Sequence, residues 1–402
     1  MSSLFFRKMI RRLPGKVIKT IRLPKPALTE GFGKREQSGV LCKKYGYKSV
    51  LIVTDQTLYA LGHHYRVVKS LQDNGVKYEL FTGVNGEPDE ETARKGRDHA
   101  LKCRADAVIA LGGGSVLDAA KVIAAAAAHG KLPAALYWQK MALGKTLPMI
   151  NIPSTAGTGS EITVAAMISN PKGVKESTVF THLRVTDVIL DSELTQNAPD
   201  KITVGCGIDA LSHGLEGYLA DVKTKDEDAE KSRECVRIVL QNLLSLRVEP
   251  HNTAKRQQMA LAAHYGGNAI NKQLAGYVHA FAHTLGAFYH ISHSDAIAYC
   301  LLPVIAFQKE ICRKKLFDIS VHCGFAKEGD DGETGVQALL DKIRELLVSC
   351  GYGSGMTEMD EKDYPALVKG INSDAINYSP AMILTDEEIV SLLRQIKGGI
   401  AG

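Results

Sequence analysis

Short apolar runs alternate with amphipathic stretches through the first half of the chain. The runs are rich in β-branched residues and have the length of buried parallel strands; they lie at 49–54, 78–81, 107–111, 149–152 and 188–190. Helical patterns separate them at about 58–74, 89–104 and 115–128. This alternation predicts an α/β domain with an open parallel sheet and right-handed crossovers over residues 30–197.

The second half of the chain has a different pattern. Strand signals stop near Pro199, and helical periodicity follows at 207–220, 226–248, 254–271, 276–286, 295–310, 334–350 and 386–396. Gly286 is expected to end or bend the helix that begins at 276. The pattern predicts an all-α second domain over residues 198–402.

Composition places the chain among ordinary soluble globular proteins. Its 402 residues suffice for two domains, with 45% hydrophobic and 23% charged residues. The eight cysteines are scattered without a CxxC pair, which argues against a disulfide framework and against a cysteine-ligated zinc site. Such cysteine usage suits a reducing compartment, and we expect a cytoplasmic protein.

The formal net charge of +5 comes from a basic head. Residues 1–29 contain eight Lys or Arg and no acid, whereas the rest carries 41 basic against 44 acidic residues. A nucleic-acid binder would carry its basic excess on the folded body, so nucleic acid is not an expected partner. The head is interpreted as a basic N-terminal extension, with weak membrane-surface association through residues 1–25 and a targeting role as alternatives. No apolar run approaches the length of a membrane span.

The densest chemistry lies in residues 276–298. This stretch holds four of the chain's 13 histidines, His279, His283, His290 and His293. Upstream, Asp209 and His213 are four residues apart, and so are His279 and His283, so each pair shares one helical face. Imidazoles together with a carboxylate suit Fe(II) or Zn(II). For each pair an ordinary helix-surface contact remains the alternative, and the HxxxH pair lacks the glutamate that a metalloprotease needs.

Three stretches of the first half suggest a nucleotide site. The sequence GGGSVLDAAK, at 112–121, follows a strand and opens a helix, an arrangement that favours phosphate; alternatively, Ser115 and Asp118 form a capping box. Asp55 ends a strand, where an acid binds ribose hydroxyls or simply caps a helix. The sequence PSTAGTGSEIT, at 153–163, offers hydroxyls to a phosphate or ribose, or else satisfies its own backbone.

Four motifs resemble the iron-dependent (group III) alcohol dehydrogenases in their order and spacing. They are GGGSVLDAAK, STAGTGSEIT, GIDALSHGLEGY and HAFAHTLGAFYHISH, and the resemblance extends from about Lys16 to the C-terminus. The resemblance implies that the metal ligands are Asp209, His213, His279 and His293. It places His283 beside the nicotinamide and the substrate. It assigns to the dinucleotide site the residues Gly113, Gly114, Ser115, Asp118, Thr155, Thr158 and Lys175. Asp55 stands where NAD-using members often carry an acid, which favours NAD over NADP.

The function implied by the resemblance is an alcohol dehydrogenase that transfers hydride between an alcohol or aldehyde and NAD(H), with Fe(II), or alternatively Zn(II), polarising the substrate oxygen. The family also implies a homodimer. Alternatives are a glycerol dehydrogenase-like polyol oxidoreductase, a dehydroquinate synthase-like enzyme, a hydroxyacid–oxoacid transhydrogenase, and a non-enzymatic metal-binding or assembly protein. The sequence departs from the family pattern without removing a ligand, at Glu87, Val185, Ser294, Ala296 and Ile297.

Overall fold

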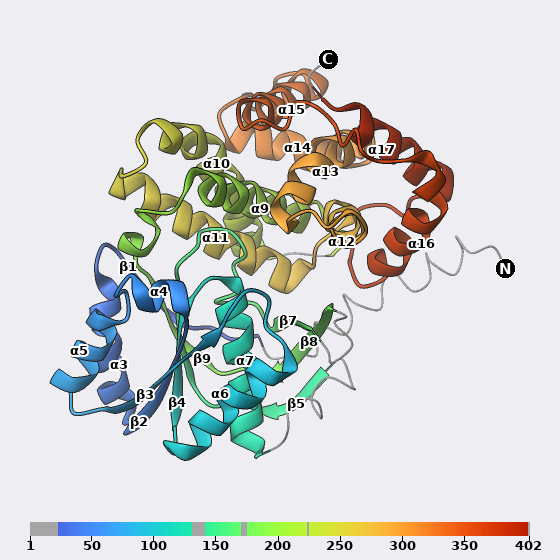
Figure 1. Ribbon diagram of the computed structural model, residues 1–402. Coiled ribbons are helices and arrows are strands. Elements are labelled where there is room, and N and C mark those ends of the chain that lie inside the picture. The colour runs from blue at the N-terminus through green and yellow to red at the C-terminus, as the bar shows by residue number, and fades with distance from the viewer. Residues whose placement is uncertain (1–22, 131–140, 170–174, 223–224, 401–402) are drawn as a thin grey trace. The chain divides into compact units, whose positions relative to one another are not determined.

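The computed structural model describes residues 23–130, 141–169, 175–222 and 225–400 (Figure 1). Most of the predicted basic extension lies outside these residues. The chain divides into two compact units. Of the described residues, the α/β unit comprises 23–198 and His251–His264, and the helical unit comprises Pro199–Pro250 and the chain from Tyr265 onward.

A six-stranded parallel sheet forms the centre of the α/β unit, in the order β1-β9-β6-β4-β2-β3. Its strands are β1 (Ala27–Glu30), β2 (Ser49–Asp55), β3 (Lys77–Val84), β4 (Ala107–Gly112), β6 (Met149–Pro153) and β9 (Val185–Leu190). All of the predicted strands belong to this sheet, and the predicted open parallel architecture is confirmed. The edge strand β1 was not predicted, and it begins inside the stretch assigned to the basic extension.

Helices cover both faces of this sheet. Around it lie η1 (Lys34–Gln37), α3 (Ser38–Tyr45), α4 (Gln56–Ala60), α5 (Tyr65–Asp73), α6 (Glu90–Lys102) and α7 (Gly114–His129). Figure 1 shows α3 and α5 on one side of the sheet and α6 and α7 on the other. Cys42 of α3 and Leu71 of α5 belong to a fully buried cluster with Ile52 and Ile109 of the sheet. The helix predicted over 58–74 is two helices, since Gly62 adopts a φ of 75°, which an α-helix cannot continue through.

A small second sheet completes the α/β unit. Its strands are β5 (Met141–Lys145), β7 (Ala165–Ser169) and β8 (Lys175–His182), in the order β5-β8-β7, and η2 (Ser192–Thr195) follows β9. β7 pairs antiparallel with β8. The sequence analysis missed this sheet. Two of the five residues of β7 are alanines, which are depleted in strands, and only alternate positions of this strand are buried.

The helical unit is all-α, as predicted: the described residues 199–222 and 225–400 contain no strand. Its helices are α9 (Asp200–Leu219), α10 (Asp226–Val248), the end of α11 (Thr253–Gln273), α12 (Tyr277–Tyr289), α13 (His293–Phe307), α14 (Lys309–His322), α15 (Gly332–Ser349), α16 (Tyr364–Ala375) and α17 (Asp386–Gly398), with η3 (Glu361–Asp363) before α16. α9 is buried along most of its length, so it forms the centre of this unit.

Two details of the helical unit differ from the prediction. α14 and α16 were not predicted. α12 continues through Gly286 and ends at Tyr289, where His290 adopts a left-handed φ of 54°. A single glycine within a helix costs only about 1 kcal/mol, which packing can outweigh. None of the described helices is long and apolar enough to cross a membrane.

Candidate metal centre and dinucleotide loop

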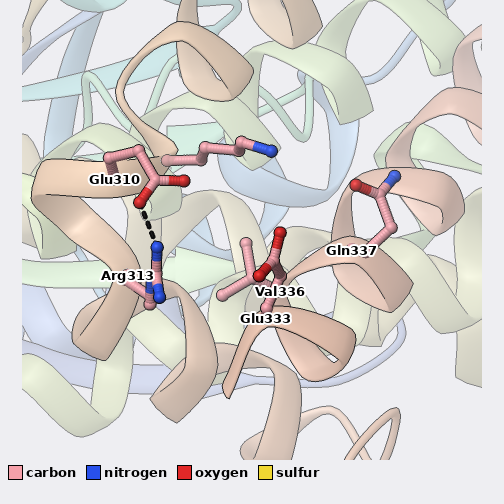
Figure 2. A pocket seen from close by; sticks show the side chains of 6 residues that line it. Glu310, Arg313, Glu333, Val336 and Gln337 are labelled. Carbon is pink, nitrogen blue, oxygen red and sulfur yellow. Dashed lines mark hydrogen bonds and ion pairs between the residues drawn. The ribbon is translucent and has the colours of Figure 1, made fainter. Parts of the chain in front are cut away.

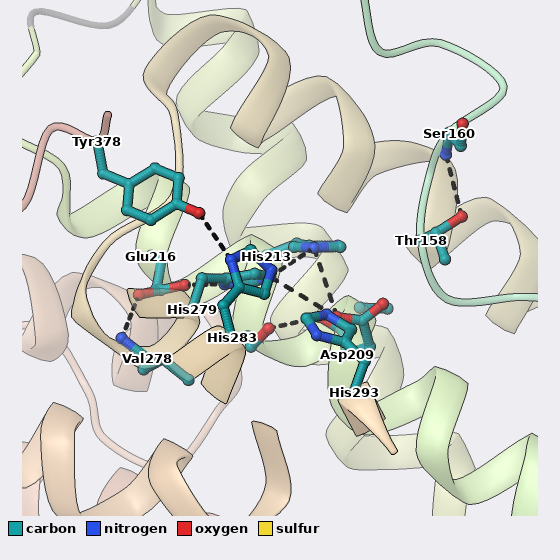
Figure 3. Close-up of polar contacts among 12 residues, drawn as sticks. Thr158, Ser160, Asp209, His213, Glu216, Val278, His279, His283, His293 and Tyr378 are labelled. Carbon is teal, nitrogen blue, oxygen red and sulfur yellow. Dashed lines mark hydrogen bonds and ion pairs between the residues drawn. The ribbon is translucent and has the colours of Figure 1, made fainter. Parts of the chain in front are cut away.

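Three helices bring the predicted metal ligands together (Figure 3). Asp209 and His213 lie one turn apart on α9, His279 lies near the start of α12, and His293 is the first residue of α13. Asp209, His213 and His279 are each at least 93% buried. The turn of chain between α12 and α13 returns His293 to the cluster, with 38% of its side chain exposed.

One carboxylate oxygen lies at the centre of this group. Oδ1 of Asp209 is 3.5 Å from Nε2 of His213, 3.8 Å from Nε2 of His279 and 3.5 Å from Nε2 of His293. The Nε2 atoms of His213 and His279 are 3.0 Å apart. A ligand atom from each of Asp209, His213 and His279 therefore lies within 4.8 Å of the others. Three imidazole nitrogens and a carboxylate oxygen form a donor set that suits iron or zinc.

The electrostatics of the cluster fit a divalent cation. Burial lowers the pKa of His213 to about 4 and that of His279 to about 3, so both rings are neutral at pH 7 and can offer a lone pair. Burial would raise the pKa of Asp209, but His213 and His293 outweigh it and keep this pKa well below its usual range. Oδ1 of Asp209 makes no hydrogen bond to any described residue. A buried charged oxygen without a donor is costly, and a cation among these four side chains would remove that cost.

Glu216 orients one of the three rings. One of its carboxylate oxygens is hydrogen-bonded to Nδ1 of His279, and the other accepts the backbone N–H of Val278 at 2.7 Å. A hydrogen bond at Nδ1 leaves Nε2 of His279 facing the cluster. Burial raises the pKa of Glu216 to about 8, against the lowering effect of the Val278 amide. A Cβ atom at Gly276 would lie 2.8 Å from this carboxylate, so only glycine fits before α12.

Sequence reasoning missed Glu216, although a signal was present. Glu216 follows His213 by three residues and Asp209 by seven, which places it on the same face of α9. A carboxylate on the same face as two candidate ligands is a reasonable partner for a third ligand. The spacing on α9 does not indicate that this third ligand is His279 of α12.

His283 lies beside the cluster with partners of its own. Its ring centre is 5.7 Å from that of His279 and 5.1 Å from that of His293. Its Nδ1 is 2.9 Å from Oδ2 of Asp374 and 3.0 Å from the hydroxyl of Tyr378. These two residues, about ninety positions further along the chain, were not predicted, because no periodicity connects them to α12.

Close packing of α11 against α9 fixes the position of His213. A Cβ atom at Gly266 would lie 3.0 Å from Cβ of His213 and 3.2 Å from the carbonyl oxygen of Ala210. One turn further along α9, a Cβ atom at Gly217 would lie 2.6 Å from that of Ala269. Glycines on both helices therefore let the backbones approach closely.

Two departures from the family pattern near His293 lie in the core. Ala296 and Ile297 are fully buried in α13. Ser294 lies against Gly205 of α9, where a Cβ atom would come within 2.7 Å of the serine hydroxyl. The space that Gly205 leaves free accommodates the serine side chain.

The dinucleotide loop begins where β4 meets α7. The helix starts at Gly114 with Gly113 as its N-cap, and no side chain caps it. The capping box suggested for Ser115 and Asp118 is therefore wrong, because the helix begins two residues too early for Ser115 to be the cap. The first amides of α7 are left without a side-chain acceptor from the cap, which suits an anion.

The hydroxyl-rich stretch after β6 lies directly against this glycine turn. A Cβ atom at Gly113 would lie 3.4 Å from Cγ2 of Thr155, and one at Gly114 would lie 3.0 Å from Cγ2 of Thr158. Ser154 also donates its backbone N–H to the carbonyl of Gly112 at 2.9 Å. Two stretches that the sequence separates by about forty residues thus form one polar surface at the ends of β4 and β6.

The remaining predicted cofactor residues differ in their surroundings. Asp55 ends β2 and caps α4, accepting the backbone N–H of Leu58 at 2.8 Å, so the capping alternative is realised. Asp118 is turned toward β7 and accepts the backbone N–H of Met167 at 2.8 Å. Lys175 is the first residue of β8, and its side chain lies outside the described part of the structure.

A separate hollow on the helical unit is not a comparable site. It lies at α14 and α15 and is lined by Lys309, Glu310, Arg313, Glu333, Val336 and Gln337 (Figure 2). Glu310 and Arg313 form an ion pair across one turn of α14. Such a surface pair is common and points to no ligand.

Comparison with known proteins identifies the class to which this fold and these residues belong. A family model described as "Iron-containing alcohol dehydrogenase" matches residues 26–192, and one described as "Fe-containing alcohol dehydrogenase family, C-terminal" matches residues 203–397. The chain belongs to the iron-containing alcohol dehydrogenase family and is an oxidoreductase of that class.

Several relatives extend over most of the chain. Alcohol dehydrogenase 4 of Schizosaccharomyces pombe is 30% identical, over 90% of this chain and 86% of its own length. The NAD-dependent methanol dehydrogenase of Bacillus methanolicus is 27% identical, over 92% of this chain and 97% of its own. Sulfoacetaldehyde reductase from Bifidobacterium kashiwanohense, solved in complex with NAD⁺, superposes with a TM-score of 0.84 at 25% identity, covering 94% of this chain and 98% of its own.

Replacing Gly266 with alanine tests how tightly α11 fixes the candidate centre. The added methyl group must push His213 or the α9 backbone aside. We expect bound Fe(II) or Zn(II) to weaken by about tenfold and the free energy of unfolding to fall by about 1–3 kcal/mol. Metal content after dialysis and thermal unfolding measure these two effects.

Gly286→Ala is the matched control, because its added methyl would meet nothing closer than 3.5 Å in the middle of α12. It should leave metal content unchanged and stabilise the helix by up to about 1 kcal/mol. Equal metal binding by the Gly266 and Gly286 variants would show that the α9–α11 contact does not govern the centre.

Proposed function

We propose that this chain is a metal-dependent alcohol dehydrogenase that transfers hydride between small alcohols and NAD. The observation that carries the proposal is the buried Oδ1 of Asp209, which has three imidazole nitrogens around it and accepts no hydrogen bond from a described residue. Family membership and the NAD-dependent methanol dehydrogenase among the relatives support the reaction class and the cofactor.

In this proposal Asp209, His213, His279 and His293 hold the metal. When bound, the divalent ion supplies Lewis acidity to an alcohol oxygen, and NAD supplies the hydride acceptor. Glu216 keeps Nδ1 of His279 occupied, so that Nε2 remains available to the ion. Iron is favoured over zinc by the family name, since imidazole and carboxylate ligands accept both metals.

The dinucleotide is proposed to lie on the surface formed by the glycine turn and the hydroxyl-rich stretch. The backbone at Gly113, Gly114 and Ser115 would bind the pyrophosphate, and Thr155 and Thr158 would contact adjoining groups. This proposal is supported by the uncapped start of α7 and by the packing of both threonines on the glycines.

The remaining cofactor assignments concern Asp55 and Lys175. One carboxylate oxygen of Asp55 caps α4. The other oxygen would bind a ribose hydroxyl and repel a 2′-phosphate. NAD is therefore favoured over NADP. Lys175 is assigned to the dinucleotide site by family resemblance alone.

His283 is proposed to take the alcohol proton. Its Nδ1 is engaged by Asp374 and Tyr378, so the proton would arrive at Nε2 and leave from there to solvent. The side chain is 33% exposed, which provides a route to water.

The wider organisation is proposed as follows. Residues 30–197 form the dinucleotide-binding domain, residues 198–402 form the metal-binding catalytic domain, and residues 1–29 are a basic extension. No disulfide joins the eight cysteines, all of which lie in the described residues, and this supports a cytoplasmic location. The family resemblance supports a homodimer.

The proposed function predicts metal-dependent NADH formation. The protein is stripped with a chelator, reloaded anaerobically with Fe(II) or Zn(II), and assayed with NAD across a panel of small alcohols. We expect NADH with at least one metal and none in the stripped protein. NAD binding without turnover on any alcohol would redirect the assignment to oxoacid or polyol substrates, whereas no NAD binding would contradict the dinucleotide site.

His283→Ala separates a proton carrier from a metal ligand. We expect kcat to fall by about 100-fold and the pH profile of kcat to change, while metal content stays at the wild-type value. His279→Ala is the comparison and should lose the metal. Loss of metal from the His283 variant would show that this residue is a ligand.

Glu216→Gln tests the orientation of His279. The amide keeps the size of the side chain, but its nitrogen cannot accept a hydrogen bond, so it cannot reproduce both contacts of the carboxyl oxygens. We expect chelator-driven metal release to be about 10- to 100-fold faster, with the fold retained by circular dichroism. An unchanged release rate would mean that the hydrogen bond at Nδ1 does not hold the ring.

A further inference from the structure

Lys121 is a fully buried lysine in the middle of the α/β unit, and its side chain has 0% exposure. Its ammonium donates to Oδ1 of Asp118 at 3.1 Å, to the hydroxyl of Ser160 at 2.7 Å, and to the carbonyl of Ala165 at 2.6 Å. The hydroxyl of Thr163 is a further partner at 3.2 Å. The lysine belongs to α7, as does Asp118, whereas Ser160 and Thr163 belong to the hydroxyl-rich stretch and Ala165 is the first residue of β7.

Asp118 binds the same segment from the same face of α7. The hydroxyl of Ser160 donates to Oδ1 of this carboxylate, and the backbone N–H of Met167 donates to Oδ2 at 2.8 Å. Both oxygens of Asp118 are therefore occupied by the protein. This occupancy argues against the predicted role of Asp118 as a direct cofactor contact. We call Asp118, Lys121 and Ser160 the α7 clamp.

The α7 clamp is connected to the dinucleotide surface by one short chain of contacts. The backbone N–H of Ser160 donates to the hydroxyl of Thr158 at 3.2 Å, and Thr158 lies against Gly114 at the start of α7. Contacts that fix the position of Ser160 therefore also fix Thr158, which packs against the glycine turn at Gly114.

The other side of the same segment is held as well. Nδ1 of His264 is 3.1 Å from Oε1 of Glu161, and the side-chain amide of Asn151 donates to the carbonyl of Glu161 at 2.8 Å. All three residues are buried. Residues 160–167 are thus anchored to α7 on one side and to β6 and α11 on the other.

Stability alone does not account for a buried ammonium at this position. Removing a lysine from water costs several kcal/mol, and an apolar side chain of similar size is often as stable. Burial accordingly lowers the pKa of Lys121, against the raising effect of Asp118. The ammonium instead fixes the positions of its neighbours, because it contacts a carboxylate, two hydroxyls and a carbonyl at once.

We propose that Lys121 and Asp118 are positioning residues that hold the hydroxyl-rich stretch in the conformation that binds the dinucleotide. They would act through Ser160 and Thr158 without touching NAD. A loop already held in its bound form loses less conformational entropy on binding, so the clamp raises cofactor affinity. This inference rests on the proposed dinucleotide site.

The test compares full-length, metal-loaded wild-type protein with Lys121→Met and Ser160→Ala. Lys69→Met is the control, because Lys69 is 76% exposed on α5 of the same unit. NADH affinity is measured by fluorescence titration, and amide hydrogen exchange is followed over residues 154–167. We expect Lys121→Met to raise the NADH Kd by about tenfold or more and to lose exchange protection in this segment. Metal content and the control variant should match wild type.

Ser160→Ala keeps the test decisive if Lys121→Met does not fold, since it removes a single hydroxyl from the clamp. It should raise the NADH Kd and the KM for NAD, with kcat at saturating NAD close to wild type. Wild-type NADH affinity in Ser160→Ala, or in a folded Lys121→Met protein, would overturn the inference. Failure of the wild-type protein itself to bind NADH would instead overturn the proposed function.

Discussion

The arrangement of the helical unit depends on the free-energy cost of burying the Asp209 carboxylate. The buried carboxylate of Asp209 on α9 has an oxygen that accepts no hydrogen bond from the described residues, and three imidazole nitrogens lie within 3.8 Å of it. Neutral rings and a buried anion are stable together when a cation lies among them. The packing around Asp209 and the three histidines allows these side chains to approach one another. Gly266 lets α11 approach His213, and Gly276 leaves room for the Glu216 carboxylate that turns His279 toward the cluster.

A second buried charge organises the α/β unit by the same physical rule. An ion that has left water must be surrounded by partners, and those partners are then fixed in place. Around Lys121 they come from α7 and from the segment before β7. Around Asp209 they come from α9, α12 and α13. In each unit the buried charged group contacts segments that are distant in sequence. These segments are the ones proposed to bind the metal in one unit and the dinucleotide in the other.

The family assignment and the residue geometry answer different questions. Membership in the iron-containing alcohol dehydrogenases defines the reaction class. The side-chain contacts decide which groups remain available for it. His283 has its Nδ1 engaged by Asp374 and Tyr378, which leaves Nε2 for chemistry. Both oxygens of Asp118 accept hydrogen bonds from the protein. We therefore propose separate roles for residues that belong to one motif.

The sequence by itself determined the parallel sheet and the helical second half, and its resemblance to a known family named the four candidate ligands. Buried strands require continuous apolar runs, and ligands on one helix face recur at a spacing of four. These signals are local, so they can be read along the chain. Only the tertiary structure decided that Glu216 meets His279, that Asp374 and Tyr378 meet His283, and that Lys121 holds Ser160. It also corrected the start of α7 and the end of α12. These contacts join residues tens of positions apart, and long-range packing leaves no period in the sequence.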